Sequence, residues 1–585
     1  MNIPKGQLTL RGAVVGLAGC AVITAASVYT ALKMGALPWP IIFAAIISFF
    51  FLKALGRKRA TSLNEANVTH TIMSAGAMVA GGLAFTVPGI WILGAGDASW
   101  VEMLAVALAG VVMGLVCTAV LRRHFIEREN LEFPIGQAAA QTLIAGNGGT
   151  DDEVRAKRAG TADASGKGTG GKLFGAMGAA GVFCALRDAA GVVPAMVATL
   201  SVPGVAFGIY CSPMLIAVGY LVGVGAVAAW IAGAVFANFG LIWGASSLGA
   251  WDVAFGQGVV SSLGMGLMMG AGFGVVVKLI ASRVRSSSSR KAVDSGRVER
   301  GGDERRRFRV TAGLAACAVA ACALIVCFVL GLGPVPALIV VALTWITTAM
   351  SAQSVGQTGI DPMEIFGLIV LLAVAATSDV PAVQLFFVAG VVSVACGLAG
   401  DVMNVLKAGD IVGTDPKAQW IGQAMGAALG AVVAVTVMFV LVSAYGPDSF
   451  GPGKEFVAAQ ASVVATMVSG IPNVPTFAVG LAAGLVLQLA GLHAMMVGLG
   501  VYLPFYMSFT AALGMAVKLI YDAVCAARHR SLRAKLVAQG AEDAPSLEDM
   551  RAKSDETGLV VASGLLGGES VVGVIIALAV VLMGM

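Results

Sequence analysis

Charged side chains are scarce in this chain and are confined to short blocks that separate long apolar runs. Only 12% of the 585 residues are Asp, Glu, Lys or Arg, whereas a typical soluble protein has roughly 25%. The blocks lie at 57–59, 122–124, 151–172, 283–309 and 528–553. So few charges cannot cover a water-facing surface, which excludes a soluble multidomain protein. The pattern predicts an all-α polytopic membrane protein, because a backbone in lipid must satisfy its own hydrogen bonds.

The apolar runs predict about 16 transmembrane helices, since each crossing needs about 20 apolar residues. With every basic block placed inside, an even number of crossings separates successive blocks, as the excess of positive charge in cytoplasmic loops requires. The sequence therefore predicts a multi-pass plasma membrane protein with a cytoplasmic N-terminus. The basic loops are topology signals on this interpretation, so we expect the lipid bilayer and no nucleic acid as a partner.

Two segments are too short and too polar to cross the bilayer. Residues 130–146 lie between two basic blocks, so the chain must enter and leave on one side. A helix from Pro134 to Gly146 would span about 20 Å, which is less than the ~30 Å hydrocarbon core. Residues 455–470 have the same character. We predict paired re-entrant half-helices, which must rest against protein or a water-filled cavity.

The same two segments indicate an internal duplication, because Glu132-Phe133 and Gln137 match Glu455-Phe456 and Gln460 at identical spacing. Weaker matches follow in the same order: Asn67-Val68 with Asn404-Val405, Met214–Leu221 with Met496–Leu503, and Gly266-Leu267 with Gly564-Leu565. We therefore predict three parts: an N-terminal transmembrane repeat at 1–282, a cytoplasmic basic linker at 283–307 and a C-terminal transmembrane repeat at 308–585. Repeats with paired half-helices and glycine-interrupted spans are typical of secondary transporters. The relative orientation of the repeats stays open.

Ionisable residues inside apolar runs are the first candidate functional groups, because a charge in hydrocarbon is costly. Glu569 lies in the last predicted span and is the leading candidate for binding and releasing a coupling proton; the alternative is a neutral carboxyl hydrogen-bonded to a neighbouring helix. Further proton-coupling candidates are Asp410, His70 and Glu132. For His70 the functional interpretation is a proton relay or contact with a chelated metal, and the alternative is a packed, hydrogen-bonded histidine. Helix capping is the alternative for Glu132.

Uncharged donors and acceptors form the candidate substrate-binding set, because amides can read a substrate backbone without burying a charge. The set is Gln137, Gln141, Gln460, Asn404, Lys407, Tyr220, Tyr502 and Asn67. Helix-to-helix bonding is the alternative for the amides, and interfacial anchoring is the alternative for the tyrosines. Lys407 and Asp410 have three readings: an ion pair at the pore mouth, a clamp for the ends of a peptide, or a solvated loop pair.

Several motifs in the same order give the chain a family resemblance. Residues 130–134 with Gln137, residues 406–410, residues 500–504 and residues 563–570 resemble segments of the oligopeptide transporter (OPT) family, which includes the yellow-stripe-like metal-chelate transporters. The Asn-Pro-Gly and Lys-Ile-Pro-Pro-Arg motifs of its fungal and plant peptide-transporting branch are not evident. The chain is therefore most similar to the bacterial and yellow-stripe-like branch. The resemblance implies about 16 helices and proton-coupled uptake of peptides or metal chelates across a bacterial inner membrane.

The leading hypothesis is a proton-coupled importer of short peptides or peptide-like compounds, including metal-chelate and siderophore complexes. An uncoupled, channel-like permease for small amphipathic solutes is the alternative. An intramembrane enzyme lacks support, because no nucleophile–base constellation or phosphate loop is present. Metal ligands at helical spacing are also lacking, so a metal would arrive already chelated. We expect no cofactor besides the coupling proton, and glycine-rich surfaces permit a homodimer.

Overall fold

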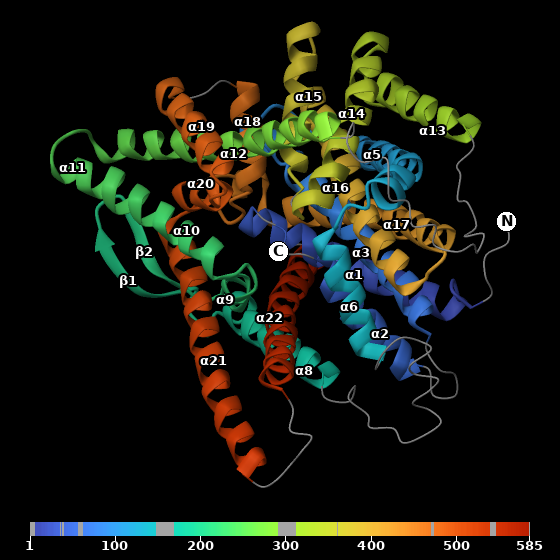
Figure 1. Cartoon of the computed structure of the whole chain (residues 1–585). Coiled ribbons are helices and arrows are strands. Elements are labelled where there is room, and N and C mark those ends of the chain that lie inside the picture. Colours follow the sequence, from blue (N-terminus) through green and yellow to red (C-terminus); the bar gives the residue numbers. More distant parts are fainter. Residues whose placement is uncertain are drawn as a thin grey trace. The chain divides into compact units, whose positions relative to one another are not determined.

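The protein is almost entirely helical in the part of the chain that its computed structural model describes (Figure 1). That part comprises residues 6–35, 37, 40–55, 62–147, 169–289, 312–359, 361–469, 473–538 and 546–583. Within it, 10 helices are long and apolar enough to cross a membrane, and shorter apolar helices accompany them. The predicted all-α membrane fold is therefore confirmed, whereas the predicted count of about 16 spans is not. Most of the predicted linker at 283–307 lies outside the described residues.

The helices form two compact units, and each unit draws on both halves of the sequence. Unit 1 comprises residues 1–163, 269–471 and 485–491, and unit 2 comprises residues 164–268, 472–484 and 492–585. The two units thus cut across the predicted sequence repeats, each taking segments that precede and follow the basic linker. The boundaries of those repeats stay a prediction.

Pairs of helices of equal length recur in the two halves of the sequence. Helices α1 and α14 have 25 residues each, and the described parts of α12 and α22 have 37 residues each. The short helices α9 and α20, which carry the matched tyrosines, have 9 residues each. The predicted duplication itself stays a prediction.

Unit 1 is organised around two central helices, α3 and α16. Its helices are α1 (Leu10–Met34), α2 (Pro40–Leu55), α3 (Leu63–Ala84), α4 (Gly89–Leu93), α5 (Trp100–Arg122), η1 (Arg123–Arg128), α6 (Pro134–Asn147), α13 (Ala312–Leu324), η4 (Ile325–Val329), α14 (Pro334–Thr358), α15 (Met363–Thr377), α16 (Ala382–Val412), α17 (Pro416–Tyr445), η5 (Pro447–Ser449) and α18 (Ala459–Ser469), with the end of α12. Every residue of α3 from Glu65 to Ala84 is buried, as is every residue of α16 from Leu385 to Gly409. Polar residues on these helices therefore face protein rather than lipid.

Glycine allows α17 to pack directly against the backbone of α3. Gly422, Gly426 and Gly430 recur every four residues and so lie on one face of α17. A Cβ at Gly426 would lie 2.1 Å from the Ile72 carbonyl oxygen, and one at Gly430 would lie 2.2 Å from the Gly76 Cα atom. Small residues that let helix backbones approach are a principal source of association between helices in lipid. Close packing of the two helices explains the glycines at these positions.

We predict that Gly426→Ala lowers the melting temperature of the purified protein in detergent. The added methyl group must push α17 away from α3, and overpacking of this kind costs about 1–3 kcal/mol. The matched control is Gly313→Ala in α13, where a Cβ meets no atom within 4 Å. Equal melting temperatures for the two variants would contradict the close-packing account.

Unit 2 is built around the long helices α21 and α22. Its elements are α8 (Thr169–Cys184), η2 (Ala185–Ala189), β1 (Met196–Val202), β2 (Val205–Tyr210), α9 (Pro213–Leu221), α10 (Val224–Val235), η3 (Phe236–Gly244), α11 (Ala245–Ser247), the start of α12 (Val253–Ser289), most of α19 (Val474–Leu489), α20 (Ala494–Tyr502), α21 (Phe505–Ala538) and α22 (Leu547–Met583). Glycine again sets the packing: Cβ atoms at Gly564 and Gly568 of α22 would lie 2.5 and 2.2 Å from carbonyl oxygens of α8. The first half of α8, at Leu173 and Met177, therefore rests directly on α22.

The apolar run at 172–200, which the sequence predicts as one of the membrane spans, instead ends in a β-hairpin in unit 2. The helix stops at Cys184, passes through the π-helical turn η2, and gives way to antiparallel strands β1 and β2. Gly191 has a positive φ of 62°, which ends the helix, and the Val192-Val193-Pro194 run that follows does not favour a helix. The strands turn at Pro203-Gly204, where Gly204 has a φ of 76° and fits the position of a type II turn that needs positive φ. The apolar run predicts a helix, and nothing in its residue pattern indicates these two strands.

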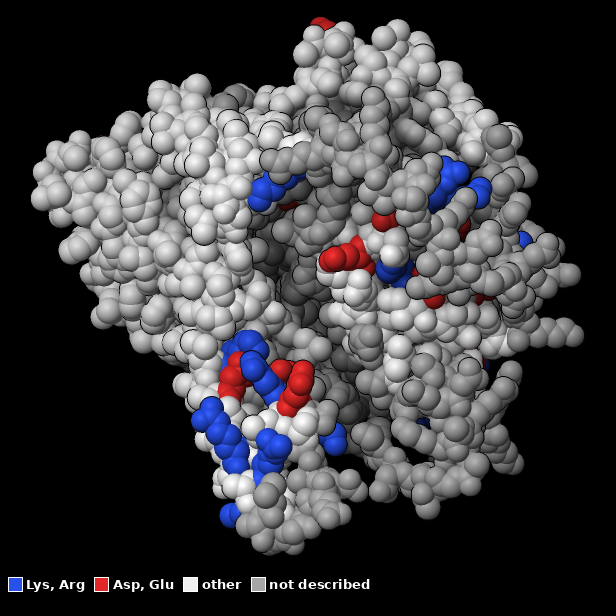
Figure 2. Space-filling view, viewed as in Figure 1, with Lys and Arg blue, Asp and Glu red and all other residues white. Residues whose placement is uncertain are grey.

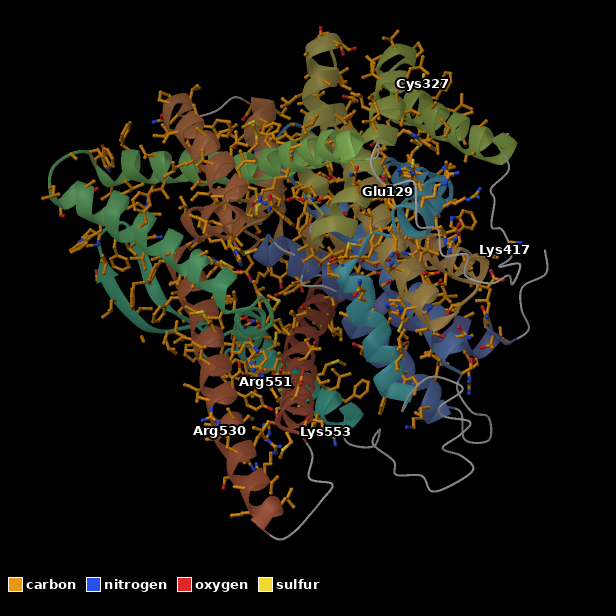
Figure 3. The ribbon with its side chains drawn as sticks, in the orientation of Figure 1. Glu129, Cys327, Lys417, Arg530, Arg551 and Lys553 are labelled. Atoms are coloured by element: carbon orange, nitrogen blue, oxygen red, sulfur yellow. The ribbon has the colours of Figure 1, made fainter. Side chains whose placement is uncertain are left out.

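Charge in unit 2 gathers on the α21–α22 hairpin (Figure 2), where α21 carries Arg528, Arg530 and Arg533. A cavity of about 230 Å³ lies between the two helices there. Its lining includes Arg530 and Arg551, both labelled in Figure 3. This basic end corresponds to the block at 528–553 that is predicted to face the cytoplasm, and the cavity contains none of the predicted site residues.

Candidate functional site

Glu569, the leading sequence candidate, is a completely buried carboxylate in unit 2 with donors on both of its oxygens. Its exposed fraction is 0%. Arg187 Nη2 donates to Oε1 at 3.0 Å, and the Ser212 hydroxyl lies 3.0 and 2.9 Å from the two oxygens. The Met214 backbone amide donates to Oε2 at 2.8 Å. Helix α22 thus presents its one buried acid to η2 and to the start of α9.

The arginine opposite Glu569 is itself held on every side. Its Nε and Nη2 atoms donate to the Asp188 carboxylate at 2.6 and 2.7 Å, and Nη1 donates to the Cys211 carbonyl. Its guanidinium lies over the Tyr210 ring at 5.2 Å from the centroid. The side chain of Arg187 is 1% exposed and that of Asp188 is 28% exposed. Asp188 therefore links the buried pair to the edge of the unit.

Ser212 positions both the acid and the helix beside it. Its hydroxyl also accepts from the Leu215 backbone amide at 3.1 Å and so caps the first turn of α9, with Pro213 at the first helical position. The Glu569 carboxylate therefore lies against the positive end of a capped helix, next to a guanidinium. The hydrogen bonds to α9 are those that the alternative for Glu569 requires, whereas the guanidinium goes beyond it. The role of Glu569 in proton coupling stays a prediction.

Sequence reasoning missed Arg187 and Asp188, although the signal was present. The two charges interrupt an apolar run that was assigned to a membrane span, and ionisable residues in such runs are functional candidates by default. The pairing itself has no sequence signal, because Arg187 and Glu569 are 382 residues apart.

We predict that Arg187→Met destabilises the protein more than the double variant Arg187→Met/Glu569→Gln. The single substitution leaves a buried carboxylate without its cation, and breaking a buried pair in this way costs about 3–5 kcal/mol. The double variant leaves an uncharged amide in the same place, so part of the melting temperature should return. A double variant that melts no higher than Arg187→Met would show that the two residues do not act as a pair.

In unit 1, buried polar groups from α3, α16 and α17 meet around Asp401, which is 2% exposed. Its Oδ2 atom accepts from the Ser74 hydroxyl at 3.0 Å and from the Gln423 side-chain amide. Ser74, Asp401 and Gln423 each come from a different helix, so one carboxylate oxygen ties three helices together. None of these residues belongs to the sequence-predicted set.

The predicted residues Asn404 and Lys407 hold the segment that leads into α6. Asn404 Oδ1 accepts from the Gly136 amide at 3.1 Å and so caps α6 from the neighbouring helix α16. A Cβ at Gly136 would lie 2.4 Å from the Asn404 carbonyl oxygen, which explains the glycine there. Lys407 Nζ donates to Asn130 Oδ1 at 3.0 Å. Residues 130–134 and 406–410, two of the segments that carry the family resemblance, therefore contact one another.

Other predicted residues of unit 1 lie at or near the same helices. Asn67 is buried on α3 and donates to the Thr414 hydroxyl at 2.9 Å. His70, one turn further along, is completely buried, and neither ring nitrogen has a hydrogen-bond partner among the described residues. Asp410 is half-buried near the end of α16. The structure thus gathers Asn67, His70 and Asp410 with Asn404 and Lys407 on α3 and α16.

The glutamines of the short helices are more dispersed. Gln137 is exposed and donates to the carbonyl oxygen of Glu132, also exposed, at 2.7 Å. Gln460 is buried and lies 3.4 Å from the Gly35 carbonyl oxygen at the end of α1. Gln141 lies on α6, but its side chain is outside the described part of the chain. The short lengths of α6 and α18 agree with half-helices, while their depth in a bilayer stays a prediction.

The two predicted tyrosines lie in unit 2 with different surroundings. Lys518 Nζ lies over the Tyr220 ring at 4.8 Å from the centroid, and the Tyr521 ring lies 6.3 Å away. Tyr502 is 8% exposed and packs against Gly264 of α12. No described contact joins either tyrosine to Glu569, so the predicted residues divide into separate groups. Their assigned roles stay predictions.

Known proteins show which family this chain is similar to. A family model described as "OPT oligopeptide transporter protein" matches residues 7–580. A curated protein of Haemophilus influenzae, named "Putative oligopeptide transporter", is 25% identical over 625 aligned positions, which cover 94% of this chain and 92% of the relative.

The span-length apolar helices and the family match together define a polytopic membrane transporter. The chain belongs to the OPT oligopeptide transporter family, because the family model covers nearly all of it. The predicted family is confirmed, and so is the prediction that the protein is a transporter and not an enzyme.

Proposed function

We propose that the protein is a proton-coupled importer of short oligopeptides or peptide-like compounds, metal chelates included. The observation that carries this proposal is the family match over residues 7–580, supported by the printed name of the relative from Haemophilus influenzae. The proposed location is a bacterial inner membrane with the N-terminus in the cytoplasm. No cofactor beyond the coupling proton is needed, and a homodimer is compatible with the proposal.

The buried pair in unit 2 supplies a physical route to coupling. A proton on Glu569 would remove the charge that Arg187 faces and weaken their contact at 3.0 Å. Arg187 would keep Asp188 as a partner and gain the capacity to bind a substrate carboxylate, for which its planar fork is suited. Loss of the proton would restore the pair and expel the substrate. Proton and peptide would then bind together, which is the requirement for symport.

Unit 1 offers groups that suit a peptide backbone. Gln137 lies in the first turn of α6, and Asn404 of α16 accepts from a backbone amide of the same turn. Side-chain amides of this kind can accept from or donate to a peptide group. Lys407 lies beside them with its ammonium on Asn130. These groups serve a tripeptide or an amino-acid-derived chelate, so both substrate classes stay in the proposal.

Transport by proteoliposomes tests the proposed function directly. We expect a labelled tripeptide to accumulate above the outside concentration when the lumen is made alkaline, and a protonophore to abolish that accumulation. A labelled iron chelate assayed in parallel separates the two substrate classes. Uptake that stops at equal concentrations under every gradient would support the alternative, an uncoupled channel-like permease.

We predict that Glu569→Gln abolishes gradient-driven accumulation but preserves exchange of labelled for unlabelled tripeptide at equal pH. The amide keeps the shape of the side chain and cannot carry the proton, so coupling should be lost before binding. The matched control is Glu548→Gln at an exposed position of the same helix, which should accumulate tripeptide like the wild type. Full accumulation by Glu569→Gln would remove the coupling role from this residue. Parallel loss of exchange and of melting temperature would indicate a structural role alone.

A further inference from the structure

The carboxylate of Asp401 is only half satisfied, in contrast to that of Glu569. Its Oδ2 atom accepts from Ser74 and Gln423, whereas its Oδ1 atom is buried and has no hydrogen-bond partner in the described structure. The residue lies in the centre of unit 1, on a helix that is buried from Leu385 to Gly409. An unpaired carboxylate oxygen in such a place is strongly disfavoured unless a donor or cation completes it.

The neighbouring amides repeat this pattern, because their unpaired atoms are also acceptors. Gln423 gives its amide nitrogen to Asp401 and leaves Oε1 buried without a partner. Gln419, one turn away, donates to the Val405 carbonyl at 2.6 Å and leaves Oε1 unpaired. Asn67 donates to Thr414 and leaves Oδ1 unpaired. All of these side chains are buried, so α3, α16 and α17 together present acceptor oxygens that lack donors.

Three buried or partly buried cations of unit 1 pair with carboxylates other than Asp401. Arg11 pairs with Glu65, Lys33 with Glu455, and Arg122 with Glu127. Titratable groups on the helix of Asp401 and on the elements packed against it are Cys20 on α1, Glu65 and His70 on α3, Asp361 beside Gly400, Glu364 on α15, and Cys396, Lys407 and Asp410 on α16. Cys20 bonds to the Gly426 carbonyl, and Lys407 bonds to Asn130. No ion pair therefore completes Asp401 within the described residues.

We propose that Asp401 and Gln423 form a binding site for a small monovalent cation in unit 1. Carboxylate and amide oxygens are the ligands that hard cations prefer, and a cation at Asp401 Oδ1 would satisfy that oxygen and Gln423 Oε1 together. Sodium would be coordinated by these acceptor oxygens, whereas a proton would bond to Asp401 Oδ1 and turn it into a donor; experiment separates the two. Binding does not depend on which substrate is carried, while use of the site for coupling rests on the proposed function.

The test measures cation binding by purified full-length protein in the absence of substrate. One arm measures retention of radioactive sodium in choline buffer, and the other measures the protein's melting temperature between pH 5 and pH 8 without sodium. The test variant is Asp401→Asn, and the matched control is Asp379→Asn, an exposed position in the same unit. Gln423→Met provides a second test if Asp401→Asn does not yield monodisperse protein.

We expect either specific sodium retention or a pH-dependent melting temperature that the control preserves and that Asp401→Asn and Gln423→Met lose. Sodium retention identifies sodium as the ligand, and a pH effect alone identifies the proton. The proposal is overturned if neither response changes in the site variants. Because no peptide is present, this result stands apart from success or failure of the peptide-transport assay.

Discussion

The cost of a charge in a lipid-embedded protein is the constraint from which the rest of this structure follows. Unit 2 meets it by giving Glu569 an arginine, a hydroxyl and a backbone amide, so that both carboxylate oxygens are occupied. Arg187 in turn uses Asp188, the Cys211 carbonyl and the Tyr210 ring. A buried pair of this kind is weak evidence for stability by itself, because removal of the charges from water offsets much of their attraction. Its value in a transporter is that a proton or an anionic substrate can replace one partner.

In unit 1 the buried acid Asp401 has a different environment. Asp401 has donors on one oxygen only, and the unpaired atoms of Gln419, Gln423 and Asn67 are also acceptors. The glycines of α17 hold these side chains in place, because Gly426 and Gly430 let α17 lie on the backbone of α3. Close helix packing and the polar cluster therefore depend on each other: a wider separation would open the cluster to lipid. The glycines of α17 thus contribute both to the helix packing and to the position of the polar cluster.

The sequence predicted the class of fold, the family and the most deeply buried acid, since each depends on local patterns or ordered motifs. Glu569 was recognisable because a single acid stood in an apolar run. Its partner was hidden by distance along the chain, and the Arg187-Asp188 pair was absorbed into a predicted span that in fact ends in a β-hairpin. Asp401 was visible beside Asn404, but only packing could show that it faces Ser74 and Gln423. Neighbouring helices, which no local pattern specifies, decide which polar residues are satisfied.

Coupling between an ion and a peptide is the central claim, and the charge moved during transport tests it most directly. Proteoliposomes that contain the protein can be adsorbed on a solid-supported membrane and exposed to a tripeptide with no net charge at equal pH on both sides. The account predicts a transient current that carries positive charge into the vesicles, because a cation enters with each peptide. Peptide uptake without any such current, in vesicles that transport the labelled peptide, would contradict coupling.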